Sequence, residues 1–349
     1  MKIAIVGAWT QIMYEESIAK NFKLLGHEVI KFSTNAYFES LISKIEQKFI
    51  VKGYYTYKLN NDIFKFSKIN NPDIILFWRP TNIMPSLLKK LKNLGIKKLV
   101  SYNHDDFSGP SLGAPVPYHH YRLWKLYLKC APLFDAHFVK RTSNIEHLKK
   151  LGAKNIYLGK MWFDPQIHHP VTLKAEEEAL FKTDVVFVGH YEPDGREKYI
   201  DALIKNEIQI KIWGGKYWNK KVLKENYSKL SPITKAEGQD YSKALSGAKI
   251  CLAFLSKINR DSYTRRCFEI PACGKVMLAE RTDQLVKMFK EDKEACFFSS
   301  IDELIFKTKW LLKNNDIREQ IAVAGLKKVW SDGCDAKSRS KEFLEKILK

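Results

Sequence analysis

A short polar segment, residues 259–274, holds the side chains of this sequence that best fit the binding of a charged substrate. It reads N-R-D-S-Y-T-R-R-C-F-E-I-P-A-C-G. Arg266 and Glu269 share one face of a predicted helix, and Asp261 lies about two turns before Glu269. A guanidinium would bind the pyrophosphate of a nucleotide diphosphate sugar, and a carboxylate would accept hydrogen bonds from its ribose. The alternative is an exposed ladder of ion pairs, each worth about 0.3–0.5 kcal/mol.

The flanking sequence predicts how this segment is held. Apolar runs at residues 250–255 and 276–279 are typical of buried strands, so the segment is predicted to form the loop and short helix between them. Ser262 could cap this helix at its start. Pro271 lacks a backbone donor and Gly274 suits a left-handed turn, so the helix should end near these two residues.

The same segment resembles a known enzyme family. Asp261 and Glu269 have the spacing of the E-x7-E pattern of retaining glycosyltransferases, with Asp in the first place. The strings T-R-R-C-F-E-I-P-A-C-G, A-E-R-T-D-Q-L and E-A-C-F-F are similar to those of glycosyltransferases related to the spore-maturation protein CgeB. The similarity runs from about Asp184 to Trp330 and is weaker in the N-terminal half. It implies an α/β GT-B fold, in which two Rossmann-like, doubly wound domains face each other across a cleft.

The resemblance also implies roles for the residues of the segment. The second domain would bind the donor nucleotide, with Arg266 on the diphosphate, Glu269 on the ribose and Asp261 at the transferred sugar. Spacing alone leaves Arg265 as an alternative to Arg266. The E-x7-E pattern favours retention of the anomeric configuration, although Asp261 is shorter than the usual Glu by one methylene group.

A second candidate donor-binding loop runs from Gly189 through His190 to Arg196, after the apolar strand at residues 185–188. Its glycines and the helix start at Arg196 favour an anion. CgeB-like sequences are similar here, which implies that Arg196 faces the donor diphosphate. The alternative is a solvated cation in the first turn of a helix, where the helix dipole disfavours positive charge.

The N-terminal half alternates apolar runs with helical patterns, which predicts a parallel sheet covered by helices on both faces. Such sheets bind ligands at the carboxyl ends of their strands, a position that residues 7–10, Arg79 and residues 104–106 share. His104 could act as a general base, or it could be a structural or solvated side chain. The pair Asp105 and Asp106 could hold a metal, but the resemblance places it at the acceptor or the reacting carbon instead.

The length and the irregular stretch around residues 164–170 predict three parts. Residues 1–168 form an acceptor domain and residues 169–334 a donor domain. The resemblance implies that the C-terminal helix, residues 335–349, packs back on the first domain. Arginines would stabilise the departing diphosphate, so we expect no metal and no cofactor, with the nucleotide sugar as the donor substrate.

Composition and charge limit the class of protein further. The chain is 45% hydrophobic, and its six cysteines show no metal-binding spacing, so they are predicted to be reduced core residues. No apolar run approaches the length of a membrane span, and residues 1–7 resemble a strand rather than a signal peptide, which predicts a cytoplasmic protein. The net charge is +20, and residues 1–150 carry 23 Lys and Arg against 11 Asp and Glu. This excess indicates an anionic partner, or a lysine-rich composition of no functional use.

We therefore expect a glycosyltransferase that takes a glycan or lipid-linked acceptor, with peripheral contact to an anionic membrane and no nucleic acid partner. One alternative is a nucleotide-sugar epimerase of the same fold. Another is an inactive protein of this fold that holds an anionic polymer. A nicotinamide dehydrogenase fits less well, because the sequence after Gly7, A-W-T-Q, lacks the glycines of a dinucleotide-binding loop.

Overall fold

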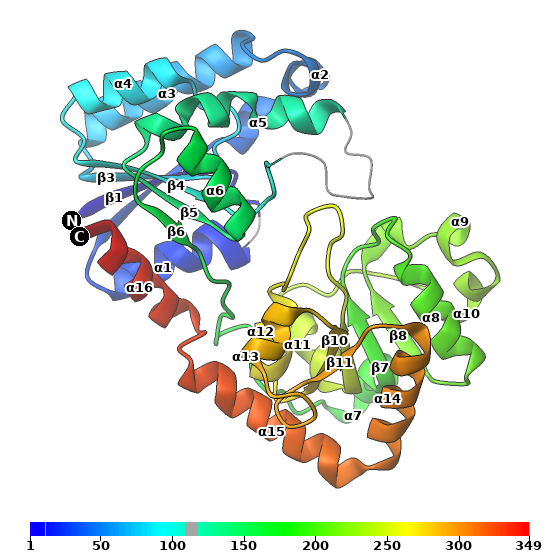
Figure 1. Ribbon diagram of the computed structural model, residues 1–349. Helices are drawn as coiled ribbons and strands as arrows, with labels where there is room; N and C mark the ends of the chain where they lie inside the picture. The colour runs from blue at the N-terminus through cyan, green and yellow to red at the C-terminus, as the bar shows by residue number, and fades with distance from the viewer. Residues whose placement is uncertain (11, 109–117, 349) are drawn as a thin grey trace. The chain divides into compact units, whose positions relative to one another are not determined.

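Figure 1 shows the computed structural model of the chain, which describes residues 1–10, 12–108 and 118–348. The chain divides into two compact units. The first unit contains Met1–Lys160 and Ala336–Lys349, and the second contains Met161–Asp335.

The first unit is built on a six-stranded parallel sheet in the order β2-β1-β3-β4-β5-β6. Its central strands are buried along almost their whole length, and β3 is also entirely apolar, because helices cover both faces of a parallel sheet. The strand order reverses between β1 and β3, which makes the carboxyl ends of these strands a topological switch point. The strands are β1 (Lys2–Gly7), β2 (Glu28–Ser33), β3 (Ile74–Trp78), β4 (Lys98–Asn103), β5 (Ala136–Val139) and β6 (Ile156–Leu158).

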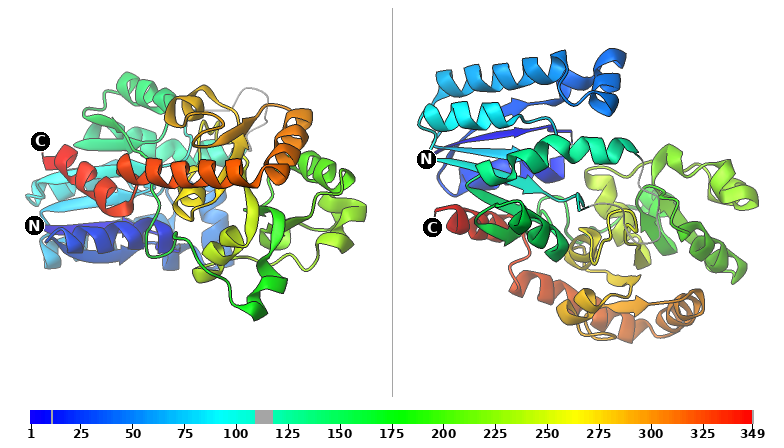
Figure 2. Two further views of the ribbon diagram at one scale, coloured as in Figure 1. Left: turned by 90° about the horizontal axis from the view of Figure 1, so that it is seen from below. Right: turned by 45° about the horizontal axis from the view of Figure 1, so that its top comes forward.

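Helices cover the two faces of this sheet, with α3 and α4 on one side and α1 and α16 on the other (Figures 1 and 2). A π-helical turn precedes α1, whereas the apolar spacing of the sequence predicts a single helix over about residues 13–25. The 17-residue helix α3 is not apparent from the sequence pattern. The helices are η1 (Ile12–Glu16), α1 (Ser17–Leu24), η2 (Asn35–Phe38), α2 (Leu41–Phe49), α3 (Tyr54–Asn70), α4 (Pro85–Asn93), α5 (Tyr118–Cys130), η3 (Ala131–Leu133), α6 (Thr142–Lys150) and α16 (Ala336–Leu348).

The C-terminal helix α16 belongs to the first unit, although it follows the whole second unit in the chain. It packs against α1, and its Phe343 ring lies 3.8 Å from that of Phe138 and 5.9 Å from that of Phe22, measured between ring centroids. These contacts bury Phe343 between the sheet and α1 and hold the end of the chain in place.

The second unit is built on a five-stranded parallel sheet in the order β11-β10-β9-β7-β8. Here the strand order reverses between β7 and β9, which gives this sheet its own switch point. The short strand β11 is not predicted by the sequence pattern. The strands are β7 (Thr183–Val188), β8 (Ile210–Trp213), β9 (Ala248–Ala253), β10 (Val276–Glu280) and β11 (Cys296–Phe298).

The helices of the second unit follow the apolar periodicity of the sequence closely. The helices α8 and α14 occupy the residues that this periodicity predicts, and Ser300 caps α14 by accepting a hydrogen bond from the Glu303 N–H. The helices are α7 (Ala175–Phe181), α8 (Arg196–Lys205), η4 (Gly215–Tyr217), α9 (Lys220–Leu223), η5 (Lys224–Asn226), α10 (Tyr227–Leu230), α11 (Gln239–Ser246), α12 (Arg266–Ala272), α13 (Asp283–Met288), α14 (Ile301–Lys313) and α15 (Asn315–Ser331).

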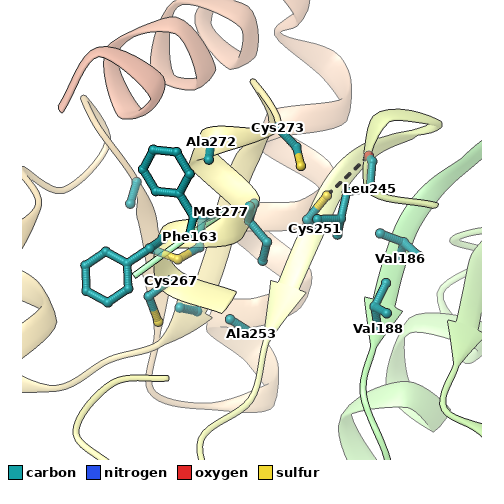
Figure 3. Close-up of a cluster of buried hydrophobic side chains, with 14 of the residues drawn as sticks. Phe163, Val186, Val188, Leu245, Cys251, Ala253, Cys267, Ala272, Cys273 and Met277 are labelled. Carbon is teal, nitrogen blue, oxygen red and sulfur yellow. Dashed lines mark hydrogen bonds between the residues drawn. The ribbon is translucent and has the colours of Figure 1, made fainter. Parts of the chain in front are cut away.

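The cysteines act as core residues, as the sequence predicts. All six are buried and none forms a disulfide. Figure 3 shows Cys251, Cys267 and Cys273 pointing into one apolar cluster, where the Cys251 thiol donates a hydrogen bond to the Leu245 carbonyl at 3.6 Å. Burial raises the pKa of Cys273 to about 12, so this thiol remains protonated and unreactive at neutral pH.

The first unit ends at Lys160, earlier in the chain than the boundary predicted after residue 168. The reason is that the next residues are apolar and buried in the second unit, where Met161 and Phe163 join the core cluster. The Phe163 N–H donates to the Cys334 carbonyl at 3.1 Å, so the first and last residues of the second unit lie side by side.

Candidate functional site

The switch point of the second sheet collects most of the residues that the sequence predicts for the donor. Gly189 follows the end of β7, and the loop of residues 254–265, which contains Asp261, follows the end of β9. The helix α12 then begins at Arg266. Ligands of open parallel sheets bind outside the carboxyl ends of the strands at such a point, because the chain leaves a crevice there.

Arg266 is the positively charged group best placed to meet an anion at this switch point. Its guanidinium lies against Gly189: a Cβ atom at residue 189 would be 3.1 Å from Arg266 Nη1 and 2.8 Å from the Phe187 ring. The Arg266 Nε atom is buried without a hydrogen-bond partner, and Nη2 donates only a long bond, 3.4 Å, to the Phe254 carbonyl. No carboxylate in the described part of the chain forms an ion pair with it, so its charge is available to a ligand.

Arg265 is already committed to a partner within the protein. Its Nε atom donates to Glu269 Oε1 at 3.0 Å, and its guanidinium lies 5.2 Å from the centroid of the Trp162 ring. Both members of this ion pair are buried. Arg265 is therefore buried and paired, whereas Arg266 is only half-buried and pairs with no carboxylate among the described residues, so the choice of Arg266 for the donor stays a prediction that these contacts favour.

Glu269, which the sequence predicts to bind the ribose of the donor, lies in the same buried network. One carboxylate oxygen accepts the Tyr241 hydroxyl at 2.6 Å, and the other accepts Arg265 and lies 3.6 Å from His168 Nε2. Burial acts to raise the pKa of Glu269, but His168 and Arg265 outweigh it and hold that pKa below its ordinary value. Glu269 is therefore ionised and enclosed, and its contacts support α12, whereas contact with the ribose stays a prediction.

Arg196 also differs from its predicted role, because its own loop neutralises it. The guanidinium donates to both carboxylate oxygens of Asp194, at 2.8 and 2.6 Å, and to the His190 carbonyl at 2.9 Å. Glu192 lies 3.6 Å away, and the side chain of Arg196 is only 2% exposed. Arg196 holds the shape of the loop through these bonds, and they leave its guanidinium buried and neutralised. Exposed His190, 3.2 Å from Glu192, remains on the surface of that loop.

Asp261 lies in the loop before α12, where its backbone N–H donates to the Ser256 carbonyl at 2.9 Å. The preceding residue, Arg260, has a positive φ of 48°, which turns the chain at this place. The position of Ser262 in the sequence suggests that it caps α12, but it does not. The helix begins four residues later, and the Ser262 hydroxyl donates to Gln284 instead.

Three residues at this edge are not identified by sequence reasoning. The Ser256 hydroxyl donates to Glu192 at 2.7 Å, and the exposed Lys257 donates to the Asp194 carbonyl at 2.7 Å. Glu280, at the end of β10, accepts the Leu255 N–H at 2.6 Å, and burial raises its pKa. The position of each residue immediately after an apolar strand is the signal that could have identified it.

The first unit has a polar cavity of about 330 Å³ at its own switch point, between the ends of β1 and β3. Arg79 follows β3 in a left-handed conformation, with φ 50°, and Trp9 follows β1 with φ 56°. Such values are costly for residues other than glycine, and they concentrate at functional sites. The cavity is lined by residues from five segments, among them Tyr14, Glu15, Gln47, Arg79 and His104.

His104 and Asp105 lie together at this cavity. The Arg79 guanidinium donates to one Asp105 oxygen, and the other oxygen lies 3.7 Å from His104 Nε2. Burial acts to raise the pKa of Asp105, but the positive groups around it hold that pKa well below its ordinary value. Burial lowers the pKa of His104 to about 4, so the ring is neutral at pH 7 and is a weaker base than the sequence suggests. Its Nδ1 atom is buried without a hydrogen-bond partner.

Asp106 is separated from this pair although it is adjacent in sequence. Its side chain is 3% exposed and accepts hydrogen bonds from the Ser108 N–H at 2.9 Å and the Asn144 amide at 3.0 Å. It therefore fixes the loop after β4 to α6, and it does not join Asp105 in a catalytic or metal-binding pair.

Glu15 is one of the cavity residues that the sequence does not predict. It lies in the π-helical turn, and Oε1 accepts the Trp9 N–H at 3.1 Å. Gly7 provides the space, because a Cβ atom there would lie 2.5 Å from Glu15 Oε1. Burial raises the pKa of Glu15. Next to it, Tyr14 stacks on His104 with ring centroids 4.8 Å apart, so one π-helical turn delivers two side chains to the cavity.

Comparisons with known proteins bear on the fold and on the reaction family. Residues 196–345 match the family model described as glycosyl transferase-like, a range that contains Asp261, Arg266 and Glu269. Solved structures match across both units. A glycosyltransferase from Rickettsia africae covers 100% of this chain and 98% of its own, at 16% identity and a TM-score of 0.70. The Anabaena protein HepE, solved in complex with UDP and glucose, covers 100% of both chains at 12% identity and a TM-score of 0.66. The chain has the GT-B fold.

The names of other structurally similar proteins state different activities. Sucrose-phosphate synthase from Thermosynechococcus elongatus matches at 11% identity, with a TM-score of 0.71 and coverage of 99% of this chain and 98% of that one. A putative UDP-N-acetylglucosamine 2-epimerase from Listeria monocytogenes matches less well, with a TM-score of 0.56 at 12% identity, covering 99% of this chain and 94% of that one. No curated protein is similar enough in sequence to count as a relative.

Within this GT-B chain, the described residues include no group of three or more His, Cys, Asp or Glu side chains that converge as metal ligands do. Of the two adjacent carboxylates that the sequence suggests as a metal site, Asp105 is bound by Arg79 and Asp106 by Asn144.

The buried histidines of the first unit predict that the protein loses stability in mild acid. Burial lowers the pKa of both His104 and His137 to about 4. Between about pH 6.5 and pH 4 the unfolded chain therefore binds protons that the folded chain does not, so stability falls as the pH falls. Each histidine should remove about 2 kcal/mol between pH 7 and pH 5. Urea unfolding at both pH values measures this, and His104→Gln should show the smaller loss. Equal losses in wild type and variant would contradict the assignment.

Proposed function

We propose that this protein is a glycosyltransferase that moves a sugar from a nucleotide diphosphate sugar to a glycan or lipid-linked acceptor. The observation that carries the proposal is the Arg266 guanidinium, which lies at the switch point of the second sheet, against Gly189, with no carboxylate partner in the described part of the chain. The family match over residues 196–345 supports the reaction type. The UDP and glucose held by HepE support a UDP sugar as the donor.

Arg266 would bind the donor diphosphate and stabilise the negative charge that develops on it as the sugar leaves. This is the role that a divalent cation has in other enzymes, so we propose transfer without a metal. Asp261 would contact the transferred sugar, and the E-x7-E spacing favours a retaining mechanism in a CgeB-like enzyme. Arg265 and Glu269 would position Arg266 by fixing the first turn of α12.

The cavity of the first unit would bind the acceptor. Glu15 and the neutral ring of His104 each offer a hydrogen-bonding site for a sugar hydroxyl, and Tyr14 and Trp78 provide aromatic surface beside them. Asp105 would hold Arg79 in place rather than take up a proton, because its pKa is far below neutral pH. A site of this kind fits the uncharged hydroxyl groups of a glycan.

A screen of nucleotide sugars tests this function. At a concentration of about 100 Kd the true donor should stabilise the second unit by about 2.7 kcal/mol, which corresponds to a rise in Tm of about 5–10 °C. Slow hydrolysis of that donor should continue after treatment with EDTA. Conversion of the donor alone into an epimer would identify an epimerase instead. No response to any nucleotide sugar, together with salt-dependent binding of heparin, would identify a polyanion-binding protein.

A further inference from the structure

Helix α2 is inverted relative to the usual amphipathic helix of a globular protein. Its apolar side chains face solvent: Leu41 is 75% exposed, Ile42 69%, Ile45 47% and Phe49 61%. Its buried side chains are the polar Ser43 and Glu46. Scattered apolar residues on a surface are ordinary, but a whole helix face of this kind marks a surface that contacts another apolar phase.

The inversion is fixed by specific contacts. Glu46 accepts hydrogen bonds from the N–H groups of Tyr55 and Thr56, at 3.0 and 2.8 Å, and from the Thr56 hydroxyl at 3.0 Å, so it caps the start of α3. Gly53 provides the necessary space, because a Cβ atom there would lie 2.2 Å from the Glu46 carboxyl carbon. These bonds set the rotation of α2 and thereby hold its apolar face outward.

The apolar surface continues beyond α2. Ile50 is 51% exposed, and Tyr54 and Tyr57 at the start of α3 are 69% and 54% exposed. We call the surface formed by Leu41, Ile42, Ile45, Phe49, Ile50, Tyr54 and Tyr57 the α2 patch. Helix α5 packs against α2 and exposes two more tyrosines in its first turn, Tyr118 and Tyr121 (Figure 1). Tyrosine is enriched at membrane interfaces because its ring is apolar and its hydroxyl is polar.

The exposed charges within residues 41–58 all have one sign, and one exposed acid, Glu39, lies just before them. Between residues 41 and 58 the exposed charged side chains are Lys44, Lys48, Lys52 and Lys58, and the single acid, Glu46, is buried. Lys44 and Lys48 lie at the edge of the apolar face of α2, because they are one turn from Leu41 and Ile45. Apolar side chains edged by lysines are typical of helices that lie in the surface of an anionic bilayer. Two copies of this patch would repel each other if they met face to face.

We propose that the α2 patch docks this protein onto the surface of an anionic lipid bilayer. Docking would be peripheral, because no helix in the described part of the chain combines the length and the apolar character that a bilayer crossing needs. Gln47, on α2, lines the same cavity as Glu15 and His104. Docking would therefore bring the mouth of that cavity close to the lipid surface. This last step, which favours a lipid-linked acceptor, rests on the proposed function, whereas docking itself does not.

Co-sedimentation with vesicles tests the proposal. The full-length protein should bind vesicles that contain phosphatidylglycerol much more tightly than vesicles of phosphatidylcholine alone, and salt should weaken the binding. Phe49→Glu should weaken it about tenfold or more, because a charge enters the face that contacts lipid. The matched control is Phe306→Glu in α14, since Phe306 is 66% exposed and lies in the other unit. Equal binding by the two variants would overturn the proposal.

A second pair of variants tests the charge. Lys44→Glu with Lys48→Glu should lower binding to anionic vesicles about tenfold or more, and Lys313→Glu with Lys327→Glu, at exposed sites of the second unit, should lower it less. Far-UV circular dichroism confirms that each variant is folded. Absence of vesicle binding by the wild type, or a wild-type dimer in sedimentation velocity that Phe49→Glu separates without any vesicle binding, would refute the lipid proposal in favour of another partner. Neither result depends on donor binding, so it leaves the proposed enzyme function untouched.

Discussion

Replacing Arg266 with glutamine should lower kcat for sugar transfer about 10²–10³-fold and leave the protein folded. The glutamine cannot supply the positive charge that stabilises the departing diphosphate, and the donor should also bind about 1.5–3 kcal/mol more weakly. Stability should change by less than about 0.5 kcal/mol, because the one hydrogen bond that Arg266 makes in the described structure is 3.4 Å long. Steady-state kinetics with the donor found in the screen, together with thermal unfolding, measure both effects.

The control for Arg266→Gln is Lys249→Gln. Lys249 is the second residue of β9, at the amino-terminal end of the strand and so away from the switch point, and it pairs with Asp184 at 2.7 Å. Its removal takes away one positive charge without touching the switch point, so kcat should be unchanged. A partial recovery in Arg266→Lys would show that charge, and not only shape, is required. If Arg266→Gln retains wild-type kcat and donor affinity, Arg266 does not bind the donor diphosphate as proposed.

Replacing Glu269 with alanine should destabilise the second unit by about 3–5 kcal/mol. The substitution leaves the Arg265 guanidinium buried without its carboxylate partner and also removes the acceptor of the Tyr241 hydroxyl. A residue that only contacted the ribose from the surface would instead lower donor affinity with little loss of stability. Chemical denaturation monitored by tryptophan fluorescence separates these two outcomes.

The double variant Arg265→Met with Glu269→Leu is the control for Glu269→Ala. Replacing a buried ion pair by apolar residues of similar volume is often close to neutral, so the double variant should be more stable than Glu269→Ala alone. If Glu269→Ala unfolds as the wild type does and only donor affinity falls, Glu269 contacts the donor directly and the buried network is not its main role.

Much of the fold is predictable because its apolar periodicities are strong. The strand β3 is a continuous apolar run, β7 and β9 contain the apolar runs 185–188 and 250–253, and α8 and α14 have the expected spacing and length. The polar motif predicted between two strands does lie between β9 and β10, at the switch point of the second sheet. By contrast, α3 mixes Tyr, Asn and Lys with its apolar residues, and the rotation of α2 depends on Glu46, which binds an element later in the chain.

Site roles are less predictable than site positions, because a side chain's partner depends on geometry that spacing does not contain. Arg196 and Glu269 both lie near the switch point, yet Asp194 neutralises the first and Arg265 the second. Asp105 and Asp106 are adjacent in sequence but point to different partners, Arg79 and Asn144. Glu15 reaches the cavity of the first unit only because a π-helical turn interrupts the helix that the pattern predicts.

The most direct test of the account is hydrogen–deuterium exchange of the full-length protein with and without UDP. If the diphosphate binds at the carboxyl ends of β7 and β9, hydrogen–deuterium exchange of the backbone amides should slow in residues 189–195 and 254–269. It should not change at the opposite edge of the same sheet, around the starts of β7 and β9. Protection confined to other parts of the chain, or no protection at UDP concentrations of several millimolar and with no other nucleoside diphosphate, would contradict the assignment of this site.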